Sequence, residues 1–344
     1  MSALCFYFVE PLGRFLGSSD KLLPYVIEYM SWYVPFLVFY EILNIGMFYI
    51  RLDGSPNYAM MCNATAAILN ILLDYIFIFE FGWGMMGAAF ATSLGTVVGG
   101  LMTLVYLMHY SHDLRLYRIK LSRKSLRMTF RNIGYMVKLG NSAFVSEASI
   151  ACMMFLGNYV FIRNLGEDGV AAFSIVCYFF PIIFMVYNAI AQSVQPIISY
   201  NFGAGQPERV RKALRLSLRT ALICGICFFI FTTLCCRNIV ALFIDRSYSA
   251  FDIAVNGIPY FGIGFIFFAI NMIGIGYYQS IERGQRATII TLLRGVVFML
   301  IGFFVLPPIL GVPGIWLAVP LAELLTTLYI IGIYFKDRFI VRRR

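Results

Sequence analysis

The sequence predicts an all-α polytopic membrane protein, and both its composition and the length of its apolar runs support this prediction. Of its 344 residues, 60% are hydrophobic and only 13% are charged, whereas roughly 25% of residues are charged in a typical soluble domain. Many apolar runs reach the about 20 residues that a helix needs to cross a bilayer. We therefore expect the excess apolar surface to face lipid.

Ten membrane-spanning helices are expected, of which the first is partial. Their approximate ranges are 1–17, 24–50, 59–82, 86–109, 132–163, 168–202, 214–240, 250–281, 286–307 and 313–335. Several of these ranges exceed the length of a straight crossing, which predicts tilt or extension into water. No polar block between them is long enough to form a separate soluble domain.

Loops that are rich in Lys and Arg alternate with loops that are poor in them. Nineteen of the 27 Lys and Arg residues fall in loops of one parity, seven of them between 111 and 131, and five fall in the opposite loops. Because cytoplasmic loops carry the excess of Lys and Arg, we expect a multi-pass protein of the cell membrane with a cytoplasmic C-terminus. The net charge of +10 then reflects topology, and we expect no nucleic-acid partner.

Two distant stretches are similar, which predicts two repeated, pseudo-symmetric halves. The stretch 84–91 (GMMGAAFA) opens one span, and the stretch 311–318 (GVPGIWLA) opens the last. Internal repeats are typical of secondary transporters. We expect residues 1–110 to form an incomplete first bundle, from the remnant of a third helix through a sixth. Residues 111–131 are then a basic cytoplasmic linker, and residues 132–344 a complete six-helix bundle.

The two halves differ in length, because six spans follow the linker and only three and a fraction precede it. If the first half repeats the second, two helices and most of a third are expected to be missing before Met1. The chain is then an N-terminally incomplete version of a twelve-helix protein, with about 10 helices present. A short protein with asymmetric halves is the alternative.

Asn70 and Asp74 form the sharpest polar pair inside a span. Their i, i+4 spacing puts both side chains on one helical face. At 1.5 Å per residue, Asp74 lies about 12 Å from the outer end of its span, and Thr92, on the next antiparallel span, about 9 Å from the same end. The three side chains can therefore meet at one depth. A carboxyl group there could take up a proton or, with neighbouring oxygens, hold a sodium ion; the alternative is a structural hydrogen bond between helices.

Further polar side chains inside the second half are candidates for lining a substrate cavity. They are Glu147, Asn158, Asn188, Gln192 and Gln195. The last three lie at i, i+4 and i+7, and such a stripe either faces a water-filled cavity or joins helices. Arg294 and Glu323 lie on adjacent antiparallel spans at similar depth, which predicts a structural ion pair.

No motif in the sequence supports an enzyme. The chain contains no HExxH or GxSxG motif, and its two histidines, His109 and His112, lie at the edge of a loop. We therefore expect no catalytic residue, no metal site and no cofactor.

Several motifs together resemble the multidrug and toxic compound extrusion (MATE) family. They are RLDGSP at 51–56, NILLD at 70–74, GWGMMGAAFAT at 82–92, Glu147, NFGAG at 201–205, and Tyr278-Gln279 before Gly284. These motifs cover essentially the whole chain in the family's order, and the resemblance rests on their joint order and spacing.

The resemblance implies two six-helix bundles around a central cavity, in a monomeric antiporter that exports small organic cations in exchange for H⁺ or Na⁺. Asn70, Asp74 and Thr92 match the family's first-bundle cation site, and Glu147 matches an acidic position that part of the family has on its seventh helix. Asn271, which we assign to the substrate cavity, stands where some members have Asp, so the sequence departs there from a second-bundle sodium site. The family's key acidic residue on the first helix would lie before the chain begins.

Two other functions stay open. One is a flippase for lipid-linked oligosaccharides, since related two-bundle proteins do that work. A flippase cavity tends to carry cations for pyrophosphate, whereas the in-span cations here are few and lie toward the cytoplasmic end: Lys138, Arg219 and Arg294. That distribution favours organic-cation cargo. The other is a non-transporting fragment.

Overall fold

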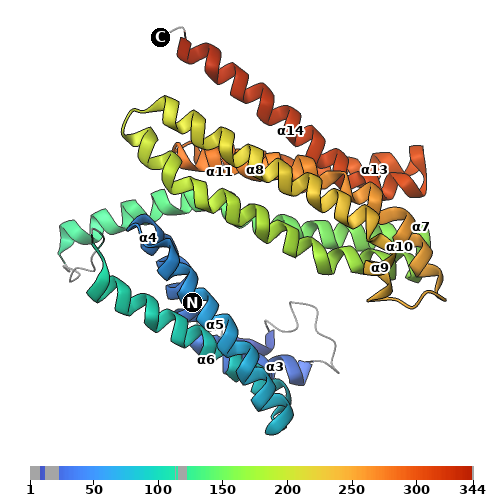
Figure 1. The fold of residues 1–344 in the computed structure, drawn as a ribbon, viewed down its shortest axis with the longest axis horizontal. Coiled ribbons are helices and arrows are strands. Elements are labelled where there is room, and N and C mark those ends of the chain that lie inside the picture. Colours follow the sequence, from blue (N-terminus) through green and yellow to red (C-terminus); the bar gives the residue numbers. More distant parts are fainter. Residues whose placement is uncertain (1–7, 12–22, 113, 115–121, 343–344) are drawn as a thin grey trace. The chain divides into compact units, whose positions relative to one another are not determined.

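The computed structural model describes residues 8–11, 23–112, 114 and 122–342. It divides into two compact units, of which unit 1 comprises Met1–Lys120 and unit 2 comprises Leu121–Arg344. The described residues of both units are almost entirely helical, as Figure 1 shows.

Unit 1 is built from helices that run back and forth. Its elements are α3 (Leu23–Tyr33), a 3₁₀ turn (Val34–Phe36), α4 (Leu37–Leu52), α5 (Pro56–Asp74), a π-helical turn (Tyr75–Glu80), α6 (Gly84–Val105) and a second π-helical turn (Tyr106–Tyr110). The break between α4 and α5 contains Gly54, whose φ of 85° is strained for other residues. Pro56 then begins α5, because its fixed φ suits the first helical turn.

The turn after α4 is tied to the end of α6 by Asp53. Its carboxylate accepts hydrogen bonds from the Tyr106 hydroxyl at 2.9 Å, from the His112 backbone N–H at 2.8 Å and from the Leu114 backbone N–H at 3.1 Å. These bonds fix the relative register of the two helices at this end of the unit.

Helix α6 packs against α3, α4 and α5, and glycines make this close approach possible. A Cβ at Gly95 would lie 2.6 Å from the Ala66 carbonyl oxygen on α5, and one at Gly100 would lie 2.8 Å from the Phe39 carbonyl oxygen on α4. Small residues let helix backbones approach closely in membranes, where burial supplies no hydrophobic driving force. The α5–α6 contact also positions the polar residues described below.

Unit 2 begins with a helical segment of 81 residues, α7 (Arg123–Gly203). Gly166, with φ 67° and ψ −156°, interrupts it, so α7 consists of two helices that meet at this residue. The remaining elements are α8 (Pro207–Leu234), α9 (Cys236–Ala241), α10 (Ser249–Gly262), α11 (Gly264–Ser280), α12 (Gly284–Leu292), a π-helical turn (Leu293–Val297), α13 (Phe298–Leu310) and α14 (Val312–Arg342).

The core of unit 2 is large and rich in aromatic residues. Its biggest fully buried side chains include Trp316, Tyr187 and Phe161, and the Phe161 ring meets the Trp316 ring edge-on at 4.8 Å between centroids. Helix α11 is central, because it packs against α7, α8, α12 and α14. Many large apolar side chains elsewhere are exposed, for example Leu234 at 78% and Leu242 at 82%, as expected for surfaces that face lipid.

The described helices agree with a polytopic membrane protein. Seven are long and apolar enough to cross a membrane, or up to eight if the pair α10 and α11, bent by 42°, counts as one span. The segment 140–203 counts once among these, although the break at Gly166 divides it near the boundary that the sequence predicted between 132–163 and 168–202. The expected first span, 1–17, lies mostly outside the described residues.

Two basic segments that were expected to be loops are helical. Helix α7 begins at Arg123, where Ser122 accepts a hydrogen bond from the Ser125 N–H as an N-cap. Helix α8 begins at Pro207 rather than near 214, with Glu208 in its first turn. Proline at the first position and an acid in the first turn both favour a helix start, so the cations of residues 209–215 lie on a helix.

Replacing Gly95 with alanine should destabilise unit 1. The new Cβ would meet the Ala66 carbonyl oxygen at 2.6 Å, so α5 and α6 must separate, and such overpacking costs about 1–3 kcal/mol. Thermal unfolding of the purified protein in detergent measures the effect. Gly134→Ala is the control, because nothing lies within 4 Å of a Cβ there; equal stability of the two variants would contradict the close contact.

Reporter fusions test the orientation that the cation distribution predicts. Fusions at Ser122 and at Arg344 should both report the cytoplasmic side, because the positive loops are retained there. Activity of a cytoplasmic reporter and silence of an exported reporter at both points is the expected result. Opposite sides, or both sides outside, would contradict the predicted topology.

Candidate functional site

Asn70, Asp74 and Thr92 meet between α5 and α6. The Asn70 Nδ2 group donates to Asp74 Oδ2 at 3.0 Å and to Thr92 Oγ1 at 3.2 Å. The Thr92 hydroxyl in turn donates to the Ala88 carbonyl at 2.9 Å, which leaves its lone pair free to accept from Asn70. All three side chains are half-buried. The amide of Asn70 therefore bridges a carboxylate on one helix and a hydroxyl on the next.

The second carboxylate oxygen of Asp74 is the unusual feature of this cluster. Asp74 Oδ1 is buried, yet it accepts a hydrogen bond from none of the residues that the structure describes. Asp74 is also the last residue of α5 before the π-helical turn 75–80, and such turns are frequent at functional sites. Leaving a buried acceptor unpaired costs about 1–3 kcal/mol, which a bound proton or a small cation at this oxygen would relieve.

The candidate cavity residues of α7 fall into two groups. Glu147 and Asn158 are exposed on unit 2, whereas Asn188, Gln192 and Gln195 are half-buried. Glu147 and Asn158 are therefore open to a ligand, and the three-residue stripe is partly covered by its own unit.

Gln195 takes part in a chain of hydrogen bonds that joins helices. Its Nε2 group donates to Gln279 Oε1 at 2.8 Å, and Gln279 Nε2 donates to Ser142 Oγ at 2.8 Å. These hydrogen bonds link both parts of α7 to α11. Of the two roles expected for the polar stripe, Gln195 therefore has the role of joining helices. Gln279 forms part of the Tyr278-Gln279 motif, but no role was predicted for its side chain.

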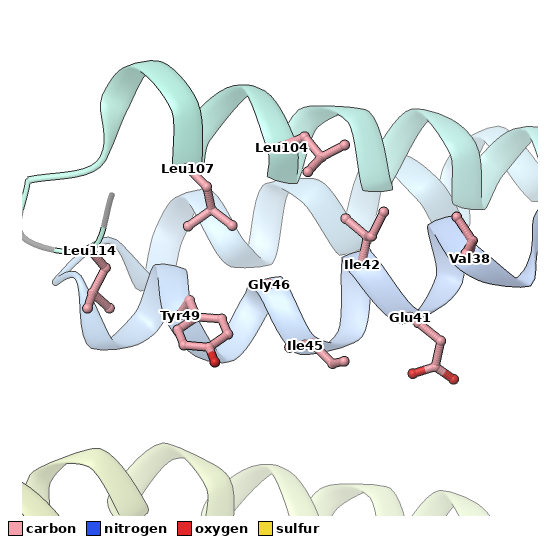
Figure 2. Close-up of a pocket in the computed structure, with 9 residues that line it drawn as sticks. All are labelled: Val38, Glu41, Ile42, Ile45, Gly46, Tyr49, Leu104, Leu107 and Leu114. Carbon is pink, nitrogen blue, oxygen red and sulfur yellow. The ribbon is translucent and has the colours of Figure 1, made fainter. Parts of the chain in front are cut away.

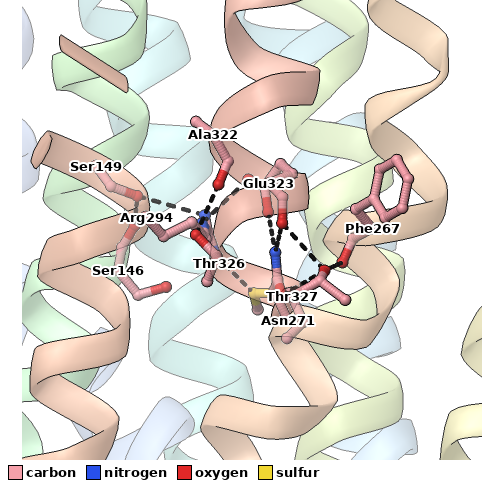
Figure 3. A network of polar contacts seen from close by, with 10 residues as sticks. Ser146, Ser149, Phe267, Asn271, Arg294, Ala322, Glu323, Thr326 and Thr327 are labelled. Carbon is pink, nitrogen blue, oxygen red and sulfur yellow. Dashed lines mark hydrogen bonds and ion pairs between the residues drawn. The ribbon is translucent and has the colours of Figure 1, made fainter. Parts of the chain in front are cut away.

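A second polar cluster lies in the interior of unit 2, at the residues drawn in Figure 3. Arg294 Nε lies 3.2 Å from Glu323 Oε1, an ion pair with both side chains 3% exposed. Asn271 Nδ2 donates to Glu323 Oε2 at 2.6 Å and to the Glu323 carbonyl at 2.8 Å, and the Thr327 hydroxyl donates to Asn271 Oδ1 at 2.9 Å. The expected ion pair is confirmed.

Three further groups lie against the guanidinium group of Arg294, although its Nε atom makes no hydrogen bond with the described residues. Its Cζ lies 4.7 Å from the centre of the Phe268 ring, Nη1 lies 3.2 Å from Met272 Sδ, and Nη2 lies 3.5 Å from Ser149 Oγ. Cation–π contact and hydrogen bonds both offset the loss of water around a buried cation. These contacts connect α7, α11, α14 and the π-helical turn 293–297.

Asn271 belongs to this network. Its side chain is fully buried, and its hydrogen bonds go to Glu323 and Thr327, so within unit 2 it is closed to a ligand as the structure stands. Its place on the tenth helix of the family had predicted a position in the substrate cavity. The i, i+4 spacing of Glu323 and Thr327 was the available signal for the network.

Unit 1 contains an apolar cavity of about 550 Å³ between α4 and α6. Its lining is aliphatic apart from Tyr49 and Glu41, and Figure 2 shows the Glu41 carboxylate at its edge. None of the three residues of the Asn70 cluster lines it.

Comparison with known proteins identifies the family. The model of the MatE family matches residues 1–76 and 142–312. This chain belongs to the MatE family. It is therefore a membrane transporter of the MATE type and not an enzyme, in agreement with the motifs that predicted the family.

Two relatives illustrate the range of the family. The chain is 28% identical to an FAD transporter of Shewanella oneidensis, over 94% of this chain and 71% of that protein. It is 26% identical to the multidrug export protein MepA of Staphylococcus aureus, over 97% of this chain and 72% of that protein. The chain thus spans about seven-tenths of the length of each relative.

Solved structures show the same fold. A MATE protein in complex with MaL6 superposes with a TM-score of 0.88 at 21% identity, over 100% of this chain and 76% of that one. A MOP superfamily transporter from Pyrococcus furiosus Vc1, described as having a binding pocket of reverse polarity, gives a TM-score of 0.87 at 21% identity, with coverage of 100% and 76%. At these identities the likeness establishes the fold alone.

Breaking the buried ion pair should destabilise unit 2 strongly. Glu323→Ala leaves Arg294 as an uncompensated buried charge and removes a hydrogen-bond acceptor from Asn271, and loss of one partner in such a pair costs about 3–5 kcal/mol. The double variant Arg294→Met with Glu323→Leu should recover part of this loss, because no unpaired charge remains. Thermal unfolding in detergent measures both.

The exposed pair Glu208–Arg211, at 2.9 Å with side chains 84% and 50% exposed, provides the control. Glu208→Gln should change the unfolding free energy by no more than about 1 kcal/mol. If Glu323→Ala proves as mild as this control, the ion pair does not stabilise the fold.

Proposed function

We propose that this MatE-family transporter is a secondary active antiporter that exports small organic cations or drug-like molecules in exchange for H⁺ or Na⁺. It acts in the cell membrane as a multi-pass monomer with a cytoplasmic C-terminus. An antiporter needs a group whose charge or ion occupancy differs between its two conformations, and an ionisable side chain inside the membrane is the natural candidate.

The observation that carries this proposal is the cluster of Asn70, Asp74 and Thr92. Asp74 combines a buried, unpartnered Oδ1 atom with an Oδ2 atom bonded to Asn70 at 3.0 Å. Carboxylate and hydroxyl oxygens are ligands that hard cations prefer, and the same carboxylate can bind a proton instead. Either ion would satisfy the unpaired oxygen, so binding and release there would change the energy of the α5–α6 contact.

Organic-cation cargo is supported by the distribution of charge on unit 2. Glu147 is an exposed carboxylate inside a span, and it could attract a cation together with the amide side chains of Asn158, Asn188 and Gln192. The buried charge of Arg294 is neutralised by Glu323 at 3.2 Å, so it adds little attraction for an anion. A relative named multidrug export protein MepA supports drug-like cargo.

An anionic cargo is the second candidate, because one relative is an FAD transporter. Arg219 is an exposed cation inside α8 and would attract phosphate groups of a dinucleotide, or the pyrophosphate of a lipid-linked oligosaccharide in a flippase. To distinguish the candidates, a molecule of each cargo class is added to the cation-efflux assay. The class that this protein transports should inhibit cation efflux.

Asp74→Asn should abolish ion-driven efflux and leave folding intact. Asparagine is nearly isosteric and keeps most hydrogen bonds, but it can neither take up a proton nor carry the charge that holds a cation. Ethidium efflux from vesicles under an imposed proton or sodium gradient should fall to the background rate, at equal protein level.

Glu80→Gln is the matched control, because Glu80 is an exposed acid at the end of the same helical segment and should retain efflux. Near-normal efflux by Asp74→Asn would mean that the coupling group lies elsewhere. Absence of gradient-driven efflux in the unmodified chain would instead support a non-transporting fragment.

A further inference from the structure

A groove of about 530 Å³ lies on unit 2, away from the residues assigned to transport. Its lining comes from α8, α11 and α14. Helices α8 and α14 both pack against α11, so α11 forms the floor of the groove and the other two helices form its walls. Figure 1 shows α14 diverging from α8 toward its C-terminal end.

The chemistry of the groove changes with depth. Counted at 1.5 Å per residue from the start of α8, Arg211 lies about 6 Å and Arg215 about 12 Å along the helix, and Leu218 lies about 16 Å along it. Counted from the end of α11, Tyr277 lies about 5 Å and Ile270 about 15 Å along that helix. Cations and aromatic rings therefore line the shallow part, and aliphatic side chains line the deep part.

The two arginines of the groove differ in their partners. Arg211 is paired with Glu208 at 2.9 Å. Arg215 is exposed and forms no ion pair with any residue in the described part of the chain. Arg215 lies one turn deeper than Arg211, at the start of the predicted span 214–240, so it is available to an anion from outside the protein, and its guanidinium matches phosphate geometry.

We propose that this groove binds one anionic phospholipid. The lipid phosphate lies on Arg215, the glycerol region meets the half-buried Tyr277 near the end of α11, and an acyl chain follows Gly274 and Ile330 toward Ile270. A Cβ at Gly274 would lie 3.0 Å from Ile330 Cδ1, so the missing side chain lets α11 and α14 pack closely at the base of the groove. Basic pockets between helices at the cytoplasmic face and aromatic residues at headgroup level are both typical of lipid contact, and a free phosphate ion would have no use for the aliphatic depth.

Native mass spectrometry of the full chain tests this proposal. The purified, delipidated protein is mixed with equal amounts of phosphatidylglycerol and phosphatidylcholine, and the bound lipids are counted. We expect one phosphatidylglycerol to be retained in preference to phosphatidylcholine. Arg215→Gln should weaken this binding about fivefold, as expected for loss of one cation at an anionic surface. Ile331→Trp, which fills the groove from an exposed lining position, should abolish it.

Arg209→Gln is the matched control. It removes a cation from the same end of α8, but Arg209 lines a different pocket between α7 and α8, so phosphatidylglycerol binding should be unchanged. Unchanged binding in Arg215→Gln, or an equal loss in Arg209→Gln, would overturn the site in favour of diffuse attraction. Displacement of the lipid by inorganic phosphate would overturn it in favour of a site for a free anion.

Discussion

Inside a bilayer no water is present to satisfy polar groups, so each of them must find a partner in the protein or bind one. The backbone meets this constraint by forming helices, and the breaks occur at glycines and prolines such as Gly54, Gly166 and Pro207. The side chains meet it by clustering. Arg294 has Glu323 within 3.2 Å, and Asn70 reaches both Asp74 and Thr92.

The two polar clusters answer this constraint differently. In unit 2 the charges of Arg294 and Glu323 cancel, and Asn271, Thr327 and the Phe268 ring extend the network. Such a network holds helices in one arrangement. In unit 1 one oxygen of Asp74 stays without a donor among the described residues. The cluster in unit 1 is incomplete because the Asp74 carboxylate has no cation beside it among the described residues, whereas the Glu323 carboxylate faces Arg294 at 3.2 Å. An unpaired carboxylate is sensitive to a proton or cation, and this difference in charge pairing separates a structural centre from a candidate for coupling.

Small residues determine where the incomplete cluster lies. Gly95 brings the backbone of α6 against Ala66 and Asn70 of α5, and Thr92 is less than one turn from Gly95 on the same helix. Because Gly95 has no side chain at this contact, the Thr92 hydroxyl comes within 3.2 Å of the Asn70 amide on the neighbouring helix. In unit 2, Gly295 likewise allows a close helix contact, because the Ser149 side chain occupies the space where a Cβ of residue 295 would lie. The neighbouring Arg294 contacts the same serine.

The sequence by itself determined the helical membrane class, the family and the meeting of Asn70, Asp74 and Thr92, because hydropathy and helical spacing are local and an antiparallel hairpin fixes relative depth. It also predicted the pairing of Arg294 with Glu323. Only the tertiary structure decided that Asn271 is buried beside Glu323, that Gln195 bonds to Gln279, and that one oxygen of Asp74 is left unpaired. These outcomes depend on helix rotation and on contacts between residues far apart in the chain, which spacing along one helix does not specify.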